Sequence, residues 1–266
     1  MKKSLFIAAI TLFGMAEVSL GQCVNLHVNT KWEECSFQLD STLTQGAWEQ
    51  FTKEAGLVTY FRSLTDAKPM GAGHFEVALL QWQTGIDDSD AAWNDTFVHP
   101  DSSHWLFEGS RLPFPGLTAR VGITKKIDAA VYFTKNPKAN YGLWGGQLQY
   151  NLVNNLEQKW AATARMSFVA LYGPDDLNLN VIGFDGLVSK EIKVYSNWVS
   201  ISPYVGASLY LSNAHEKSEK VNLDDEHKAG LQGMVGAVAR LSVVRLGVEY
   251  NFANVSTLSL KVGVAF

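Results

Sequence analysis

The stretch VSISPYVGASLYLS at residues 199–212 alternates between two kinds of side chain along its whole length. One set of alternate positions is apolar: Val199, Ile201, Pro203, Val205, Ala207, Leu209 and Leu211. The positions between them are small or carry a hydroxyl group: Ser200, Ser202, Tyr204, Gly206, Ser208, Tyr210 and Ser212. Because successive side chains of a β-strand point to opposite faces of the sheet, this stretch predicts one long strand with an apolar face and a polar face.

The same alternation recurs along most of the chain. With 198–212, it marks ten segments, at about 74–86, 112–124, 126–135, 141–153, 159–172, 177–191, 229–242, 244–253 and 256–266. Strands of soluble sheets average about five or six residues, whereas a tilted strand that crosses a bilayer needs about 9–11. Lipid cannot satisfy an open sheet edge, so such a sheet must close. We therefore predict an all-β fold, a transmembrane antiparallel up-and-down β-barrel over residues 74–266. A secreted soluble β protein is the weaker alternative.

Charged residues fall on the polar face of these strands. In a membrane barrel that face points inward, so we expect a set of lumen-facing residues: Arg120, Asp128, Arg165, Arg240, Arg245, Glu249 and Lys261, with Glu76 beside them. A barrel of this size is narrow, because about eight strands leave room mainly for side chains. Unpaired buried charge is costly, so these groups are expected to pair and fill the lumen. The excess of arginine over acid indicates a preference for anions if a path exists.

The lengths of the connections test the strand count. In outer-membrane barrels one set of turns is short and periplasmic, and the other is longer and extracellular. With ten strands, the two longest connections, 87–111 and 213–228, belong to one set. The tight turns at 124–126 and 242–244 belong to the other, together with the C-terminus, which is then periplasmic. If Leu57–Arg62 and Trp105–Leu112 were also strands, the total would be twelve.

The first 21 residues are typical of a secretory signal peptide. Lys2 and Lys3 precede an apolar run of 12 residues, Leu5–Ala16, and the small residues Ser19 and Gly21 suit cleavage before Gln22. Export takes Cys23 and Cys35 into an oxidising compartment, so we expect a disulfide between them. A lipidated Cys23 is a weaker alternative. A metal site is less expected, because only His27 lies near these two thiols.

Residues 22–73 form an N-terminal periplasmic or plug-like segment with a predicted helix at about 41–55. Leu43, Ala47, Trp48, Phe51 and Ala55 share one helical stripe. Asp40 or Ser41 can cap its start, and Gly56 suits its end. The helix is expected near the periplasmic mouth, either packed against the rim or partly inside the barrel as a plug.

The end of the chain carries a resemblance to a known class. The ending LSLKVGVAF at 258–266, which alternates and finishes on Phe266, resembles the C-terminal assembly signal of bacterial outer-membrane β-barrel proteins. The stretches SPYVGAS at 202–208 and LGVEYN at 246–251 also resemble strands of that class. The resemblance implies the bacterial outer membrane as location, with membrane lipid and the barrel-assembly machinery as partners. The resemblance implies no active-site residues.

Composition and motifs exclude several kinds of function. The chain has 26 acidic and 22 basic side chains, which argues against a nucleic-acid partner. Four acidic residues, Asp87, Asp88, Asp90 and Asp95, lack the fixed spacing of a calcium loop. Nucleophile, phosphate-loop and zinc motifs are absent, so no catalytic residue, metal or cofactor is expected. Outer-membrane proteases are similar only in having acidic and histidine residues in outer loops, here His99, Asp101, His104, Asp224, Asp225 and His227.

Three functions are therefore compared. The first is a narrow pore or channel-like protein for small solutes. The second is a non-conducting structural or adhesive surface barrel. The third, a surface hydrolase that uses the loop Asp and His residues, is the weakest because no motif flanks those residues.

Overall fold

The computed structural model describes residues 36–87, 89–97, 111–135, 140–195 and 198–266. The predicted signal peptide, the candidate disulfide of Cys23 and Cys35, and the loop residues His99, Asp101 and His104 lie outside this range.

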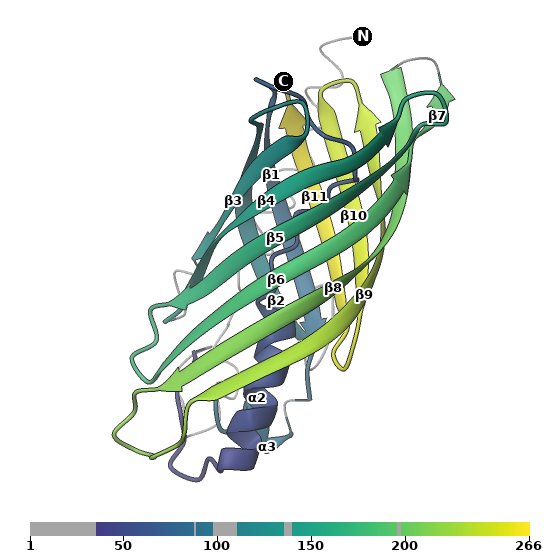
Figure 1. The fold of residues 1–266 in the computed structure, drawn as a ribbon. Helices are drawn as coiled ribbons and strands as arrows, with labels where there is room; N and C mark the ends of the chain where they lie inside the picture. The colour runs from purple at the N-terminus through teal and green to yellow at the C-terminus, as the bar shows by residue number, and fades with distance from the viewer. Residues whose placement is uncertain (1–35, 88, 98–110, 136–139, 196–197) are drawn as a thin grey trace.

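The described chain is an antiparallel β-barrel (Figure 1). Its strands are β1 (Phe75–Gly85), β2 (Arg111–Gly122), β3 (Ile127–Lys135), β4 (Gly142–Asn155), β5 (Trp160–Tyr172), β6 (Leu177–Lys190), β7 (Ile192–Tyr195), β8 (Val199–Glu216), β9 (Glu226–Leu241), β10 (Val244–Phe252) and β11 (Thr257–Ala265). Apart from β7, strands that follow one another in sequence pair with each other, and β1 pairs with β11. The short β7 pairs with β8 alone, and β6 pairs directly with β8. Ten strands thus close the barrel, and β7 only lengthens the edge beside β8.

The strand count agrees with the prediction of ten and excludes the alternative of twelve. Of Leu57–Arg62, the first two residues belong to a helix and the rest adopt no strand. In the range 105–112, only residues 111 and 112 are described, and they begin β2. β8 and β9 have 18 and 16 residues, more than a bilayer crossing requires, and their hairpin extends past the other strands (Figure 1).

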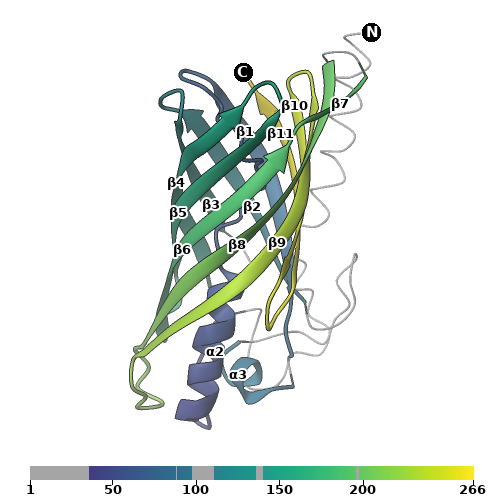
Figure 2. The same ribbon diagram turned by 45° about the vertical axis from the view of Figure 1, so that its right-hand side comes forward.

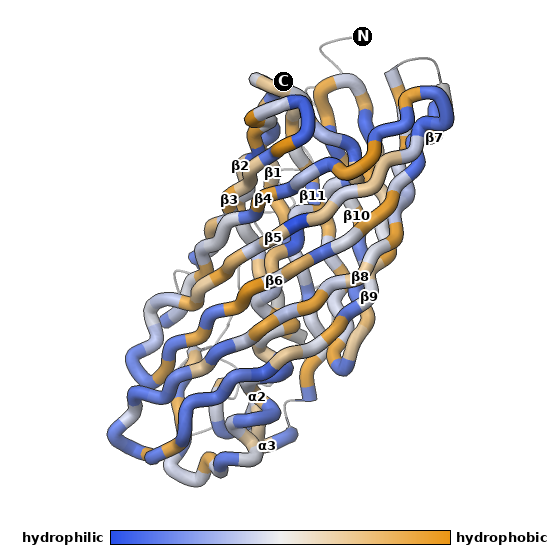
Figure 3. Tube along the Cα trace, in the orientation of Figure 1, coloured by the Kyte–Doolittle hydropathy of each residue, from blue (hydrophilic) through white to orange (hydrophobic). Residues whose placement is uncertain are grey.

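The barrel is apolar outside and polar inside. Large hydrophobic side chains point outward on every face, among them Val131 at 60% exposure, Val205 at 59% and Leu260 at 52%. The inner face buries serine, threonine, glutamine and charged groups, and Figure 3 shows the resulting alternation along the strands. A soluble protein has the opposite arrangement, so this is the construction of an outer-membrane β-barrel. Among the described residues no helix has the length and apolar character needed to span a membrane.

The connections divide into two sets at opposite ends of the barrel, as the loop lengths predicted. The C-terminal mouth, where Phe75 and Phe266 meet, has the connections 123–126, 156–159, 191–198 and 242–243. The distal mouth has the connections 86–110, 136–141, 173–176, 217–225 and 253–256. Two helices lie at the distal mouth, α2 (Gln45–Val58) and α3 (Ala91–Asn94) (Figure 2).

α2 differs from the predicted helix in its bounds. Its N-cap is Thr44, whose side chain accepts a hydrogen bond from the backbone of Ala47. Asp40 instead closes a turn by accepting from the N–H of Thr42 at 2.9 Å, and this shifts the start by about one helical turn. Gly56 does not end the helix. A Cβ there would lie 2.7 Å from the Cβ of Ser212, so glycine permits close packing on β8.

The mouth at which α2 lies also differs from the expectation. The helix was expected near the mouth that holds the C-terminus, and it lies at the distal mouth (Figure 1). Its apolar stripe packs there into an aromatic core, in which the ring of Phe51 is stacked on Trp48 and meets Trp93 of α3 edge-on. The side chain of Glu49 forms an ion pair of 2.6 Å with Lys228 of β9. This core is completed by loops from distant parts of the chain, so no local pattern indicates its position.

Candidate functional site: the lumen and its C-terminal mouth

The segment that follows α2 runs through the inside of the barrel. Residues 59–70, which we call the luminal segment, lead from the distal mouth to the C-terminal mouth, where β1 begins (Figure 1). Residues 59–67 have no regular secondary structure, and all nine are buried. A buried stretch of this kind must find partners for its backbone polar groups outside helix or sheet ladders.

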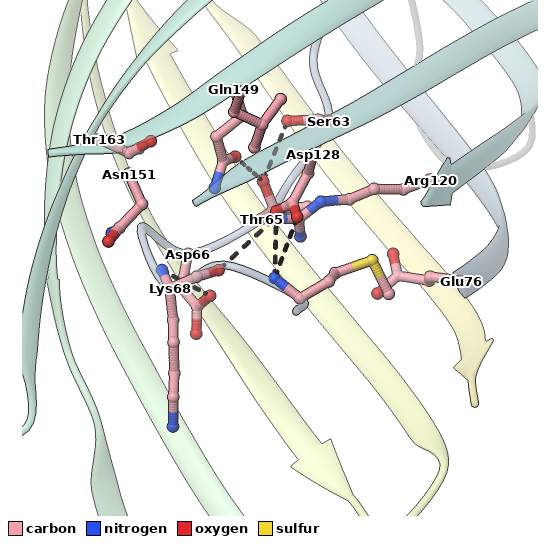
Figure 4. Close-up of polar contacts among 12 residues, drawn as sticks. Ser63, Thr65, Asp66, Lys68, Glu76, Arg120, Asp128, Gln149, Asn151 and Thr163 are labelled. Carbon is pink, nitrogen blue, oxygen red and sulfur yellow. Dashed lines mark hydrogen bonds and ion pairs between the residues drawn. The ribbon is translucent and has the colours of Figure 1, made fainter. Parts of the chain in front are cut away.

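Side chains of the barrel wall supply those partners. Arg165 of β5 donates to the carbonyl oxygen of Thr65 at 2.5 Å, and Lys261 of β11 donates to that of Ser63 at 3.2 Å. Ala67 is held from two strands. Its carbonyl accepts from Asn151 Nδ2 of β4 at 3.0 Å, and its N–H donates to Ser189 Oγ of β6 at 3.0 Å. The polar inner face is therefore a binding surface for the protein's own backbone. Figure 4 shows the wall residue Gln149 against the side chain of Thr65 in the luminal segment.

Arg62 ties the beginning of the luminal segment to β10 and β11. Its Nε donates to Asn251 of β10 at 2.9 Å, and its Nη2 donates to Thr257 of β11 at 3.1 Å. The same Nη2 donates to the carbonyl oxygen of Leu57 at 2.6 Å, which closes the end of α2. The guanidinium also lies over the ring of Trp82, 5.7 Å from its centroid. Arg62 was not among the predicted site residues, although a lone arginine in the mostly apolar stretch 55–64 is a usable signal.

Two further contacts hold acidic groups inside the barrel. The hydroxyl of Tyr60 donates to the carboxylate of Asp185 on β6, and both residues are buried. The hydroxyl of Tyr204 on β8 donates to Glu249 on β10 at 2.7 Å. Asp185 is a second residue that sequence analysis missed. It lies on the inner face of its strand, since it is buried between the exposed residues Phe184 and Gly186.

The predicted lumen-facing residues lie on the inner wall of the barrel or line the cavity at its C-terminal mouth. Arg120 pairs with Asp128 at 2.5 Å, and Lys261 pairs with Glu76 at 2.7 Å. Three others contact the luminal segment or a residue on another strand: Arg165 contacts Thr65, Arg240 contacts Asp66, and Glu249 on β10 contacts Tyr204 on β8. Arg245 differs from the rest, because its described hydrogen bonds reach only the carbonyl oxygens of Ser242 and Val244.

A cavity of about 350 Å³ opens at the C-terminal mouth, where the luminal segment leaves the barrel. Its charged lining consists of Asp66, Lys68, Glu76, Arg120, Arg240, Arg245 and Lys261. His74, Met70, Pro69 and Phe266 complete much of the rim. The lining thus holds five cations and two side-chain carboxylates.

Phe266, the candidate assembly residue, closes the seam between the first and last strands. Its N–H donates to the carbonyl of Phe75 at 2.9 Å, and its carbonyl accepts from the N–H of Phe75 at 2.9 Å. The two rings are 5.3 Å apart, and the Phe266 side chain is exposed on the outside.

Of the loop residues of the hydrolase alternative, the structure describes Asp224, Asp225 and His227. Asp225 contacts His215, whereas His227 is bonded to Asn213. Among the acidic residues considered for calcium, Asp87 accepts from Ser89 and Asp90 caps α3. Asp88 lies outside the described range. The described part of the chain has no group of three or more His, Cys, Asp or Glu residues placed to hold a metal ion.

A known family model matches most of the barrel sequence. Residues 85–266 match the model of the "Family of unknown function (DUF6588)". The chain belongs to this family. The DUF6588 match begins at the last residue of β1, so it covers the other nine barrel strands but neither α2 nor the luminal segment. A search of the curated proteins finds no match to this sequence.

Several solved structures are similar to the DUF6588 chain at low identity. The attachment invasion locus protein Ail of Yersinia pestis is 10% identical over 73% of this chain and 99% of its own, with a TM-score of 0.29. The N-terminal β-barrel domain of Pseudomonas aeruginosa OprF is 9% identical over 74% and 100%, with a TM-score of 0.30. The β domain of the Bordetella autotransporter BrkA is 11% identical over 73% and 100%, with a TM-score of 0.40.

Proposed function

We propose that this protein is a non-conducting surface barrel, closed to solutes by its own luminal segment. The observation that carries this proposal is the run of nine buried residues, 59–67, that occupies the lumen without regular structure. A narrow pore for small solutes remains the rival function. It requires the luminal segment to leave, or to move aside.

The contacts of the luminal segment support the closed state. Its backbone and side chains are bonded to residues on β4, β5, β6, β9, β10 and β11, for example Asn151, Arg165 and Asp185. If the luminal segment left the lumen, all of these hydrogen bonds would break, and the arginines of the barrel wall would lose their partners. Buried polar groups that lose their partners cost about 1–3 kcal/mol each, so an open state is strongly disfavoured.

The orientation follows from the turns. We place the C-terminal mouth, with its short turns, in the periplasm and the distal mouth outside the cell. The outer surface is then built from α2, α3 and the long hairpin of β8 and β9. The pair Lys228–Glu49 and Gln45, whose side chain donates to the carbonyl of Asp224 at 3.3 Å, join α2 to the hairpin. Trp93 of α3 donates to Glu54 of α2 at 2.6 Å. These contacts make the outer end one body, which suits a structural or adhesive role.

Export and assembly belong to the same proposal. The signal peptide at 1–21 sends the chain through the inner membrane, and Phe266 at the end of the last strand is read by the barrel-assembly machinery. Membrane lipid then covers the apolar exterior. Supporting this, the side chain of Phe266 stays exposed in the closed barrel, although its backbone completes the seam.

Conductance in a planar bilayer tests the closed state. The refolded mature protein should be silent, whereas Arg62→Ala, which removes the bonds to Asn251 and Thr257, should show transient openings. A variant without residues 36–70 should conduct steadily if it inserts. Lys125→Gln, an exposed change at the C-terminal mouth, is the matched control and should stay silent. Discrete steps of equal size in the unaltered protein and in all variants would establish the pore instead.

A further inference from the structure

We propose that the cavity at the C-terminal mouth binds a soluble small molecule that carries a phosphate group. The cavity measures about 350 Å³ and is lined by the inner faces of β1, β2, β9, β10 and β11 and by the end of the luminal segment. This inference is independent of whether the barrel conducts, because a ligand can enter from the aqueous side of that mouth without crossing the lumen.

One of the five cations that line the cavity belongs to none of the described ion pairs. Two side-chain carboxylates of the lining and two just outside it are each paired with a cation of the lining: Asp66 with Arg240, Glu76 with Lys261, Asp128 with Arg120, and Glu191 with Lys68. Arg245 is the fifth cation. Among the described residues, neither a side-chain carboxylate nor the end of the chain at Phe266 forms an ion pair with it.

The place of Arg245 in the sheet makes the missing partner significant. Arg245 of β10 is directly opposite Arg240 of β9 in the register of the two strands. Like charges at directly opposed positions destabilise a sheet, so the pair needs negative charge beside it. Asp66 neutralises Arg240 at 2.6 Å. An anion beside Arg245 would complete the arrangement.

The guanidinium of Arg245 has donors available for that anion. Its two described hydrogen bonds both use Nη1, at 2.6 Å to Ser242 O and 3.1 Å to Val244 O. Nη2 and Nε are thus unused among the described contacts. A planar guanidinium with two free donors fits two oxygens of a phosphate at once. Lys68 and His74 line the same cavity and can add further donors.

Size and surroundings indicate an organic phosphate from solution. The cavity is larger than a single phosphate group requires, and Pro69, Met70 and Ala265 add apolar surface to its lining for a carbon skeleton. Its cationic lining residues Arg120, Arg240 and Lys261 belong to the inner face of the barrel, which is turned away from the lipid. A phosphate monoester of a small polar molecule satisfies both features better than a lipid headgroup does.

Calorimetric titration of the refolded full mature chain in neutral detergent, without added lipid, tests the proposal. Glucose 6-phosphate serves as the probe, with inorganic phosphate as the minimal anion and glucose as the uncharged control. Both phosphates should bind, glucose should not, and affinity should fall with added salt. Arg245→Gln should weaken binding about tenfold or more, since it removes charge-assisted hydrogen bonds.

Two further variants keep the test decisive. Lys125→Gln removes one exposed cation at the same mouth but outside the cavity, and it should bind as the unaltered protein does. Met70→Phe reduces the cavity without changing its charge, and it should weaken glucose 6-phosphate more than inorganic phosphate. Each variant is first shown to be folded by its heat-modifiable gel mobility. The proposal is overturned if folded protein binds neither phosphate, if Lys125→Gln weakens binding as much as Arg245→Gln, or if only anionic lipid vesicles bind.

Discussion

The carboxylate of Asp66, in the segment that fills the lumen, accepts two hydrogen bonds from Nη2 of Arg240 on β9, at 2.9 and 2.6 Å. Asp66 is 2% exposed, whereas Arg240 reaches the cavity at the C-terminal mouth. This one contact fastens the luminal segment to the wall and neutralises an arginine that faces a second arginine, Arg245. It therefore couples the closed state of the barrel to the charge balance of its mouth.

Substitution Asp66→Asn should destabilise the protein. The change keeps the shape of the side chain and leaves Arg240 unpaired opposite Arg245, at a cost of about 1–3 kcal/mol. Urea unfolding of the refolded protein in micelles measures this. The double variant Asp66→Asn with Arg240→Gln should recover part of the loss, because the uncompensated charge is gone. Simple addition of the two single effects would show that the pair is not coupled.

A single methyl group on β6 should loosen the luminal segment. A Cβ at Gly183 would overlap the hydroxyl of Tyr60 and the Oγ of Ser167, both held inside the barrel. We expect Gly183→Ala to lower the free energy of unfolding by about 1–3 kcal/mol, as overpacking does. Gly186→Ala is the matched control on the same strand, since nothing lies within 4 Å of a Cβ there. Equal stability of the two variants would mean that the luminal segment does not press on β6.

The pair of Lys68 and Glu191, 2.8 Å apart at the C-terminal mouth, should make stability depend on pH. Burial acts to raise the pKa of Glu191, but the hydrogen bond and positive charge of Lys68 outweigh it, and the pKa lies below its usual value. The folded state therefore releases this proton more readily than the unfolded state. The stabilisation is complete above the unfolded pKa of about 4.3 and disappears as the pH falls through the folded value.

Comparison with Glu191→Gln isolates this effect. At neutral pH the unaltered protein should be more stable than the variant by less than about 1 kcal/mol, because Lys68 is partly exposed. The difference should shrink as the pH falls below the unfolded pKa and vanish once Glu191 is protonated in the folded state as well. Unfolding midpoints across this range provide the measurement. A difference that persists unchanged at low pH would assign the effect to packing.

Phe266→Ala separates assembly from stability. The backbone bonds to Phe75 do not depend on the side chain, and that side chain is exposed, so the refolded barrel should lose only about 1 kcal/mol. In cells, however, the amount of barrel in the outer membrane should fall severalfold if the aromatic end is recognised during assembly. Phe252→Ala, an equally exposed change at the end of β10, is the control and should assemble normally. Normal membrane levels of Phe266→Ala would remove the recognition role.

The sequence by itself determined the strands, their number and the inside-out character of the barrel. Alternation such as that of Val199–Ser212 is a local property of an extended backbone, and the lengths of the strands exclude an ordinary soluble sheet. The stripe of α2 was readable for the same reason, because helical spacing is also local. The placement of charged residues such as Arg165 and Lys261 on one face followed directly from this period of two.

Only the tertiary structure decided what those inner faces contact. The partners of Thr65 and Asp66 come from strands 100 and 174 positions away in sequence, and no local pattern carries such information. For the same reason Leu57–Arg62 resembled a strand, although Arg62 takes its partners from β10 and β11. The position of α2 at the distal mouth likewise depends on contacts with residues far away in sequence, such as the ion pair of Glu49 with Lys228. Among the described ion pairs Arg245 has none, because Asp66 and Glu76 are paired with Arg240 and Lys261, which come from other parts of the chain.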